Sequence, residues 1–183
     1  MQKHFFIAIP VADETLARFA SSLKLERYYK TVYEPNEYHL TLRFLGSLTE
    51  DELRNWRRQL TEIAQMTSAF TLKLDHLERF GLVERPRVFA AGPAYEEKLF
   101  QLARQIDPDP AKPFVPHITF AKKWNQEVSL HPPEQTPAAS LHVKEIVLYQ
   151  ICPDNQPRYQ ADTRFQFGKN ERGDMIGIID ETL

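Results

Sequence analysis

The chain has 183 residues, of which 42% are hydrophobic and 26% are charged. This balance excludes a long disordered tail and favours one folded domain or two small lobes that share a core. The formal net charge of −2 excludes a protein that coats long nucleic acid through a basic excess, and the single cysteine, Cys152, excludes an internal disulfide and a cysteine-based zinc cluster. A nucleic-acid substrate would therefore be bound locally, at one phosphate or one terminus.

The N-terminal apolar stretch, residues 5–12, is short, and Asp13 and Glu14 follow it. It lacks the basic start, the long apolar core and the small-residue cleavage site of a signal peptide. No run approaches the roughly 18 apolar residues that a membrane-spanning helix needs. We therefore expect a cytoplasmic protein that does not act in a membrane.

Strand and helix patterns alternate along most of the chain. In chain order they predict strand 5–10, a helix capped by Asp13, a turn at 33–36, strand 39–45, a helix capped by Ser47 or Thr49, strands 70–77 and 87–91, helix 95–106, an exposed loop at 107–113, and strands 114–120, 143–151 and 163–167. Residues 169–183 have no clear pattern and are expected to form a tail or an edge strand.

Two short motifs of the same form, histidine-hydrophobic-threonine-hydrophobic, lie a little under half the chain length apart. Each follows a strand, a helix and a turn or loop that contains proline, at residues 39–42 and 117–120. This repetition predicts two related halves and an α+β fold, with antiparallel-rich sheets, outer helices and a central cleft. We expect residues 1–168 to form one domain of two pseudo-symmetric lobes.

Alternate residues of a strand point to opposite faces, so the alternation predicts which side chains share a face. His39, Thr41 and Arg43 are expected on one face of the first strand, and His117 and Thr119 on one face of the second. The opposite faces carry the apolar residues, namely Leu40, Leu42 and Phe44 in the first strand and Ile118 and Phe120 in the second. If the halves pack about a pseudo-twofold axis, the two imidazoles face each other across the cleft.

Two facing histidines suit displacement at phosphorus, because one neutral imidazole can act as a base while a protonated one acts as an acid. Thr41 and Thr119 can donate hydrogen bonds to phosphate oxygens, and Arg43 could offset the phosphate charge. No cysteine or carboxylate repeats with the two histidines, so the motif predicts no metal site. The remaining histidines are expected to have structural roles; they are His4, His76, His131 and His142.

The sequence resembles the two-histidine phosphoesterases, and specifically the LigT-like RNA 2′,3′-cyclic phosphodiesterases, once described as 2′-5′ RNA ligases. The matching segments are FFIAIP at 5–10, PNEYHLTLRFLG at 35–46, PRVF at 86–89, PHITFAK at 116–122, LY at 148–149 and RY at 158–159. The resemblance thus extends from residue 5 to about residue 167.

The resemblance implies a bilobed fold that hydrolyses a 2′,3′-cyclic phosphate, on an RNA end or a cyclic nucleotide, to a 2′-phosphomonoester. It implies no metal, no cofactor and no obligatory protein partner. It also makes His117 the base and His39 the acid, although the near-symmetric motifs alone leave that polarity open. Family members commonly carry a phosphate-binding arginine where this chain has Lys122, which keeps the charge but loses the bidentate fork. Strict alternation would instead point Lys123 into the cleft, so Lys122 is expected there only if the strand ends or bulges.

Two other functions are compatible with the same residues. The first is 2′-5′ joining of RNA ends, which is the reverse chemistry at the same histidines. The second is a non-catalytic module that binds a nucleotide or an RNA end. The presence of both Thr41 and Thr119 argues against such a module, because a site without catalysis need not keep both.

Overall fold

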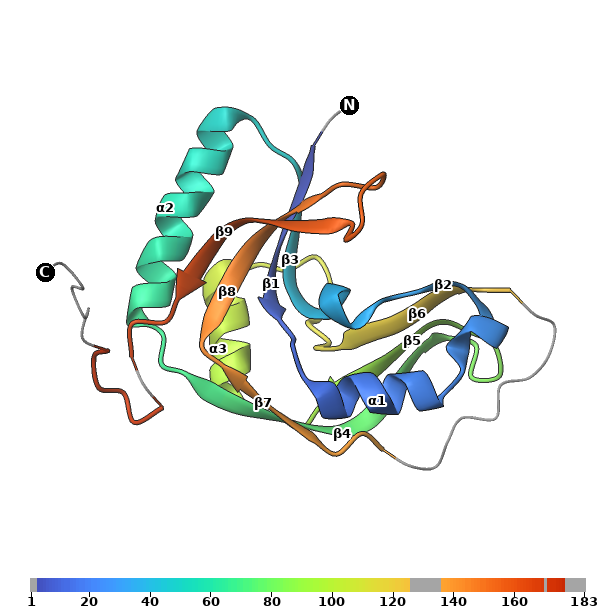
Figure 1. Ribbon diagram of the computed structural model, residues 1–183. Coiled ribbons are helices and arrows are strands. Elements are labelled where there is room, and N and C mark those ends of the chain that lie inside the picture. Colours follow the sequence, from blue (N-terminus) through green and yellow to red (C-terminus); the bar gives the residue numbers. More distant parts are fainter. Residues whose placement is uncertain (1–2, 126–135, 170, 177–183) are drawn as a thin grey trace, which may run out of the picture.

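The computed structural model describes residues 3–125, 136–169 and 171–176 (Figure 1). Within these ranges nine strands form one sheet in the order β7-β4-β5-β6-β3-β1-β8-β9, and β2 pairs with β6 beside this path. The strands are β1 (His4–Pro10), β2 (Tyr29–Val32), β3 (His39–Ser47), β4 (Phe70–Gly81), β5 (Pro86–Pro93), β6 (Ile118–Trp124), β7 (Ala139–Val143), β8 (Glu145–Ile151) and β9 (Tyr159–Gln166). All of the pairings between these strands are antiparallel, which confirms the predicted α+β class.

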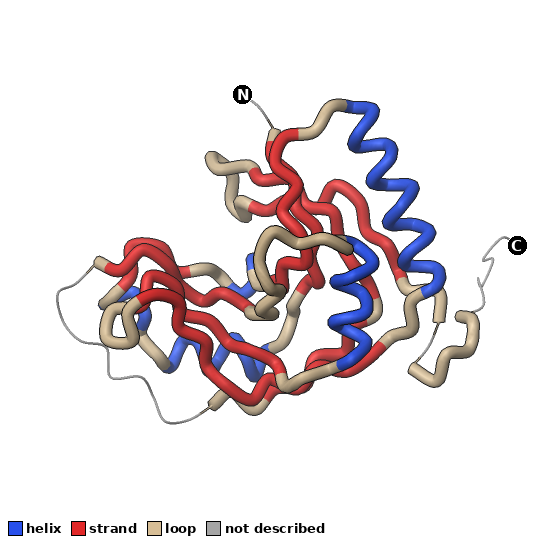
Figure 2. The backbone as a smooth tube through the Cα atoms, turned by 180° about the vertical axis from the view of Figure 1, so that it is seen from behind, coloured by secondary structure: helices blue, strands red, loops and turns tan. Residues whose placement is uncertain are grey.

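Three α-helices in the described residues cover the sheet: α1 (Glu14–Ser22), α2 (Glu50–Met66) and α3 (Glu97–Ile106). The Asp13 carboxylate accepts a hydrogen bond from the backbone N–H of Leu16 in the first turn of α1, and Thr49 forms a capping box with Glu52 at the start of α2. The predicted caps Asp13 and Thr49 are therefore confirmed, whereas Ser47 is the last residue of β3. Helix α2 packs on β8 and β9, and α3 packs on β3 and α2, as Figure 2 shows from behind.

The sheet divides into two halves at the contact between β3 and β6. Strands β7, β4, β5, β6 and β2 lie on one side of this contact, and β3, β1, β8 and β9 lie on the other (Figure 1). Strands β3 and β6 pair only through Leu40 and Ile118, both of which are fully buried. This arrangement is consistent with the predicted pair of lobes, and it brings the strands of the two histidine motifs side by side.

The observed strands differ from the predicted ones in places, for physical reasons. The predicted strand 114–120 begins only at Ile118, because Pro113 and Pro116 lack the N–H that a sheet ladder requires. The predicted strand 143–151 coincides with β8 except for Val143 and Lys144, whereas β7, which ends at Val143 and pairs with β4, was not predicted. Strand β2 was not predicted, because its four residues carry no clear alternation.

The C-terminal stretch contacts the end of α2. Gly168 lies so close to this helix that an added Cβ would stand 2.3 Å from the backbone oxygen of Gln65. Lys169 then forms isolated bridges with Ser68 and Met175. The expectation of a tail or an edge strand stays a prediction, because residues 170 and 177–183 lie outside the described ranges. None of the helices in those ranges has the length and apolarity that a membrane crossing requires.

Candidate active site

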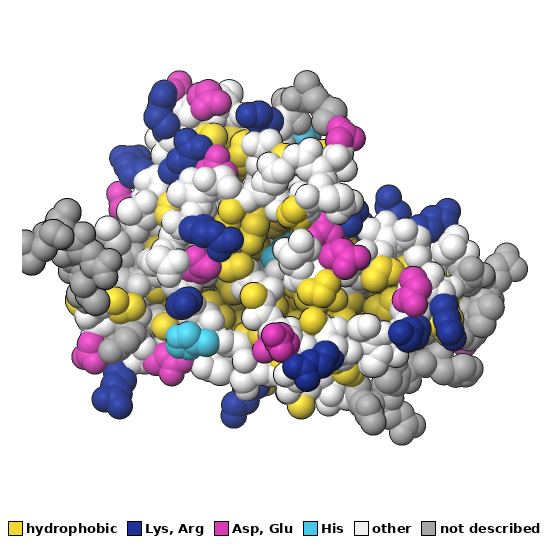
Figure 3. Space-filling model, viewed as in Figure 1, with side chains coloured by type: hydrophobic (Ala, Val, Ile, Leu, Met, Phe, Trp, Pro, Cys, Tyr) yellow, Lys and Arg dark blue, Asp and Glu magenta, His cyan; other side chains and the backbone are white. Residues whose placement is uncertain are grey.

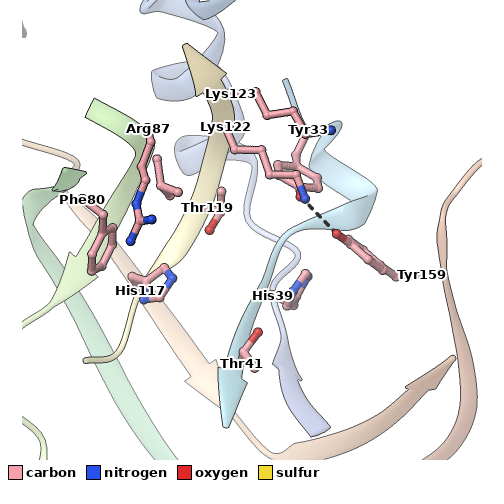
Figure 4. A pocket seen from close by; sticks show the side chains of 11 residues that line it. Tyr33, His39, Thr41, Phe80, Arg87, His117, Thr119, Lys122, Lys123 and Tyr159 are labelled. Atoms are coloured by element: carbon pink, nitrogen blue, oxygen red, sulfur yellow. Dashed lines mark hydrogen bonds between the residues drawn. The ribbon is translucent and has the colours of Figure 1, made fainter. Parts of the chain in front are cut away.

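The two histidine motifs meet at the junction of the halves. Because Leu40 pairs with Ile118, the antiparallel register places the histidine of each motif beside the threonine of the other. All four side chains line one cavity of about 530 Å³ (Figure 4). The complete lining is Tyr33, His39, Thr41, Phe80, Arg87, Val88, His117, Thr119, Lys122, Lys123 and Tyr159. A histidine and hydrophobic side chains are visible at the bottom of a hollow in the face that Figure 3 shows.

Both imidazoles are oriented by the same hydrogen bond. Nδ1 of His39 lies 2.7 Å from the carbonyl oxygen of Glu37, and Nδ1 of His117 lies 2.7 Å from that of Val115. A carbonyl can only accept, so Nδ1 must carry the proton in each ring. Nε2 is then the atom that accepts or donates a proton in the cavity.

His39 sits in a more enclosed environment than His117. Its ring centroid lies 4.9 Å from those of Phe6 and Tyr159, and 6.1 Å from that of Tyr149. Burial lowers the pKa of His39 below its ordinary value, and the charge of His117 acts in the same direction, although the Glu37 carbonyl opposes it. In the free protein this environment favours the neutral ring of His39.

A buried ion pair lies behind His39. The side chain of Glu37 is 1% exposed and accepts hydrogen bonds from the backbone N, Nε and Nη2 of Arg158 at 3.0, 3.2 and 3.3 Å. Burial alone would raise the pKa of the Glu37 carboxyl, but the hydrogen bonds from Arg158 outweigh it and hold the pKa below its usual value. Because the carbonyl of the same Glu37 binds His39, this pair positions the imidazole.

A bulge in β6 decides which lysine enters the cavity. Thr119 and Ala121 pair with consecutive residues of β5, so Phe120 is an extra residue, and both Phe120 and Ala121 are buried. The extra residue reverses the alternation and turns Lys122 to the face of the two histidines. Lys123 has a left-handed φ of 64° and lines the outer part of the same cavity. The lysine expected at this position is therefore present in the cavity.

Two tyrosines form the wall beside Lys122. Its Nζ lies 5.2 Å from the ring centroid of Tyr33, and the hydroxyl of Tyr159 donates to that of Tyr33 at 3.1 Å (Figure 4). Burial raises the pKa of both phenols, so both remain protonated hydrogen-bonding groups at neutral pH. Lys122 is thereby held against an aromatic surface at the edge of the cavity.

Arg43 lies outside this cavity. Strand β3 bulges at Leu42, so the expected sharing of one face by His39, Thr41 and Arg43 was wrong. The Arg43 guanidinium donates to the carbonyl of Ile106 at 2.9 Å and lies 3.3 Å from the carboxylate of Asp107. The same bulge turns Phe44 outward, where it is 60% exposed instead of part of the buried row.

Sequence reasoning missed several residues of the cavity. Phe80 lies beyond the predicted end of its strand, because β4 continues to Gly81. Arg87 follows Pro86 in a segment that resembles the family, and Figure 4 shows its guanidinium pointing into the cavity near His117. Tyr33 was predicted only as a turn residue. The sequence signal for all three was weak, since each comes from a strand end or a connection.

The other histidines lie away from the cavity or outside the described residues. His76 contacts the carboxylates of Asp75 and Glu78, and His142 contacts that of Glu171, whereas His131 is not among the described residues. Within the described part of the chain no three His, Cys, Asp or Glu side chains gather in a way that could hold a metal ion.

Comparisons with known proteins agree with this geometry. Residues 7–90 match the family described as LigT like Phosphoesterase. The chain is 31% identical over 179 residues to an RNA 2′,3′-cyclic phosphodiesterase of Geobacillus stearothermophilus, covering 90% of this chain but only 57% of that protein. It is 27% identical over 182 residues to the enzyme of the same name from Bacillus subtilis (strain 168), covering 91% and 97% of the two chains.

Solved structures of E. coli LigT share the fold of this chain. The crystal structure of E. coli LigT complexed with 3′-AMP has a TM-score of 0.75 at 23% identity, with 92% of this chain and 100% of that chain covered. The apo form has a TM-score of 0.73 at 25% identity, with 91% and 98% covered. These similarities show that the chain shares the fold of E. coli LigT and that residues 7–90 are similar to the LigT-like phosphoesterases.

Proposed function

We propose that this protein hydrolyses the 2′,3′-cyclic phosphate at an RNA end to a 2′-phosphomonoester, with His39 and His117 as its acid and base. One observation carries the proposal: both imidazoles have Nδ1 bound to a carbonyl and line one cavity with a threonine each. Two rings whose Nε2 atoms share a cavity can act as base toward the attacking water and as acid toward the leaving oxygen on opposite sides of one phosphorus atom.

The reaction needs two proton transfers. One histidine takes a proton from water as the oxygen of that water attacks phosphorus, and the other protonates O3′ as the P–O3′ bond breaks. The product then carries its phosphate on O2′, so protons and bonds balance without a further reactant. The resemblance assigns His117 as the base and His39 as the acid. The phosphate anion would raise the pKa of His39 in the complex, against the lowering effect of burial in the free protein.

The phosphate itself meets donors from several directions. Thr41 and Thr119 present hydroxyl groups, and Lys122 and Arg87 bring positive charge into the same cavity (Figure 4). Such preorganised donors stabilise the charge that develops on the phosphoryl oxygens in the transition state. Arg43 has no role in this proposal, because its guanidinium is engaged by Asp107.

The relatives support the substrate class. The Geobacillus and Bacillus subtilis relatives bear the name RNA 2′,3′-cyclic phosphodiesterase, and a structure of E. coli LigT contains 3′-AMP. These names describe those proteins. The paired histidines, threonines and cations extend the same activity to this chain.

The test is incubation of the purified protein with an oligonucleotide that ends in a 2′,3′-cyclic phosphate, followed by determination of the position of the product phosphate. We expect a 2′-phosphate, formed equally well in the presence of a chelator, because imidazoles supply both acid and base. The matched control is the His117→Ala variant. A 3′-phosphate product, or activity that is lost in chelator and restored by zinc or manganese, would reject the mechanism. Joining of 2′-5′ ends faster than hydrolysis would identify a ligase, and binding without turnover would identify a non-catalytic module.

A further inference from the structure

A second cavity adjoins the candidate active site. Its volume is about 590 Å³, and it shares Thr41, Phe80 and His117 with the first cavity. The end of α3 and the loop from Asp107 to His117 form its other side. A molecule bound at the two histidines can therefore continue into this groove, which the mechanism above leaves unused.

Aromatic side chains line the groove, of which Phe44 is exposed and Phe100 and Phe114 are half-buried. Phe44 is 60% exposed on one side, and Phe100 and Phe114 pack edge to face on the other with centroids 5.5 Å apart. Val115 beside them is 43% exposed. Apolar surface that lies open next to a polar reaction site is typical of a ligand-binding groove, and aromatic rings of this kind stack nucleobases.

The charges of the groove indicate which ligand it takes. Its lining contains the cations Arg43, Arg104 and Lys112 and the carboxylate of Asp107. Arg43 pairs with Asp107 and Arg104 pairs with Glu97, whereas Lys112 lies exposed in the lining. A terminal cyclic phosphate has one negative charge, and the first cavity already offers Lys122 and Arg87 to it. Lys112 therefore matches a second phosphate, which an RNA chain supplies at the next nucleotide.

We propose that this groove binds the penultimate nucleotide of the RNA, with its base against Phe44, Phe100 and Phe114 and its phosphodiester near Lys112. This inference rests on the proposed function and specifies its substrate class: an oligonucleotide end rather than a free cyclic mononucleotide. Each of the two cavities has the volume of a typical small-ligand site, so a dinucleotide spans them.

The test compares kcat/KM for a 2′,3′-cyclic mononucleotide with that for a dinucleotide that has the same terminal nucleoside. We expect a preference of about tenfold for the dinucleotide, which is the order of one base–aromatic stack. Phe44→Ala and Lys112→Ala should each reduce this ratio. Both side chains are exposed, so neither change removes core packing. The matched controls are Leu82→Ala and Lys73→Ala, whose side chains are also exposed and line neither cavity.

Equal kcat/KM for both substrates would overturn the inference. So would equal losses on both substrates in Phe44→Ala, because the groove would then hold the terminal nucleoside. Hydrolysis of the mononucleotide reports separately on the proposed function. If neither substrate is hydrolysed, the affinities of a mononucleotide and a dinucleotide with a terminal 3′-phosphate still decide the question, and equal affinities refute the groove.

Discussion

Arg158→Met removes one partner of the buried ion pair behind His39. Methionine keeps much of the aliphatic length of the arginine but loses the two side-chain hydrogen bonds to Glu37. The carboxylate, 1% exposed, then keeps only its contacts with backbone N–H groups, at 3.0 Å from Arg158 and 3.4 Å from Glu34. The variant therefore leaves a buried charge that is incompletely compensated.

The expected loss follows from this burial. Removing one partner of a buried ion pair costs about 3–5 kcal/mol in free energy of unfolding. The Arg158 side chain is 26% exposed and two backbone hydrogen bonds remain, so we expect the lower end, about 3 kcal/mol at pH 7. Turnover should fall as well, because the Glu37 carbonyl then holds Nδ1 of His39 less firmly.

The pH dependence of this loss identifies its cause. In the wild type the pKa of folded Glu37 lies below its ordinary value of 4.5, so its stabilisation is complete above pH 4.5 and disappears as the pH falls through the folded pKa. In Arg158→Met burial dominates and raises that pKa, so the carboxylate destabilises the variant at neutral pH and ceases to do so once it is protonated. The stability difference between the two proteins is therefore largest near pH 7 and narrows toward pH 4.

Urea denaturation at pH 7 and pH 4 measures both quantities. Arg18→Met is the matched control, because it breaks an ion pair with Glu14 whose side chains are 79% and 89% exposed, and it should leave the midpoint unchanged. A loss in Arg158→Met that is the same at both pH values would refute the electrostatic explanation. A stable variant with normal turnover would show that Arg158 does not position His39.

Further predictions test the site. His39→Ala and His117→Ala should each lower kcat by about 10²- to 10⁴-fold, and the double variant should lose much less than the product of both, which turnover measurements will show. In the free protein an NMR titration should give His39 a pKa below its ordinary value of 6.5. The free energy of unfolding should then decrease as the pH falls from 6.5 toward the folded pKa, because protonation of His39 favours the unfolded state. Denaturation of His39→Gln should show a smaller decrease over the same pH range. Thr41→Val and Thr119→Val should weaken phosphate binding and cost less than either histidine, whereas Lys122→Arg should retain activity and Lys122→Met should raise KM, as steady-state kinetics will measure.

The sequence predicted the site more fully than the strand geometry around it. The two histidines and two threonines were identifiable because strict alternation holds over the residues that they occupy. It fails at the next residues, since bulges at Leu42 and Phe120 reverse the alternation beyond each motif. One bulge placed Lys122 in the cavity, and the other removed Arg43 from it.

Bulges arise from the pairing of distant strands, so the periodicity of a single segment does not reveal them. The same reason explains the unpredicted strand β2, whose residues form a strand because β6 offers a free edge. It also explains the unpredicted strand β7, which forms against β4, whereas β8, which follows directly after Lys144, pairs with β1. Local capping, by contrast, depends on neighbours in sequence, and Asp13 and Thr49 were correctly predicted.

The carbonyl bonds to both Nδ1 atoms have a consequence for successive turnovers. Each ring exchanges protons only at Nε2, so the proposed hydrolysis leaves the former base protonated and the former acid neutral. This is the protonation state from which the reverse reaction starts. The protein therefore finishes each cycle as a catalyst prepared for the opposite direction, and proton exchange with bulk water through the open cavity is the step that resets it.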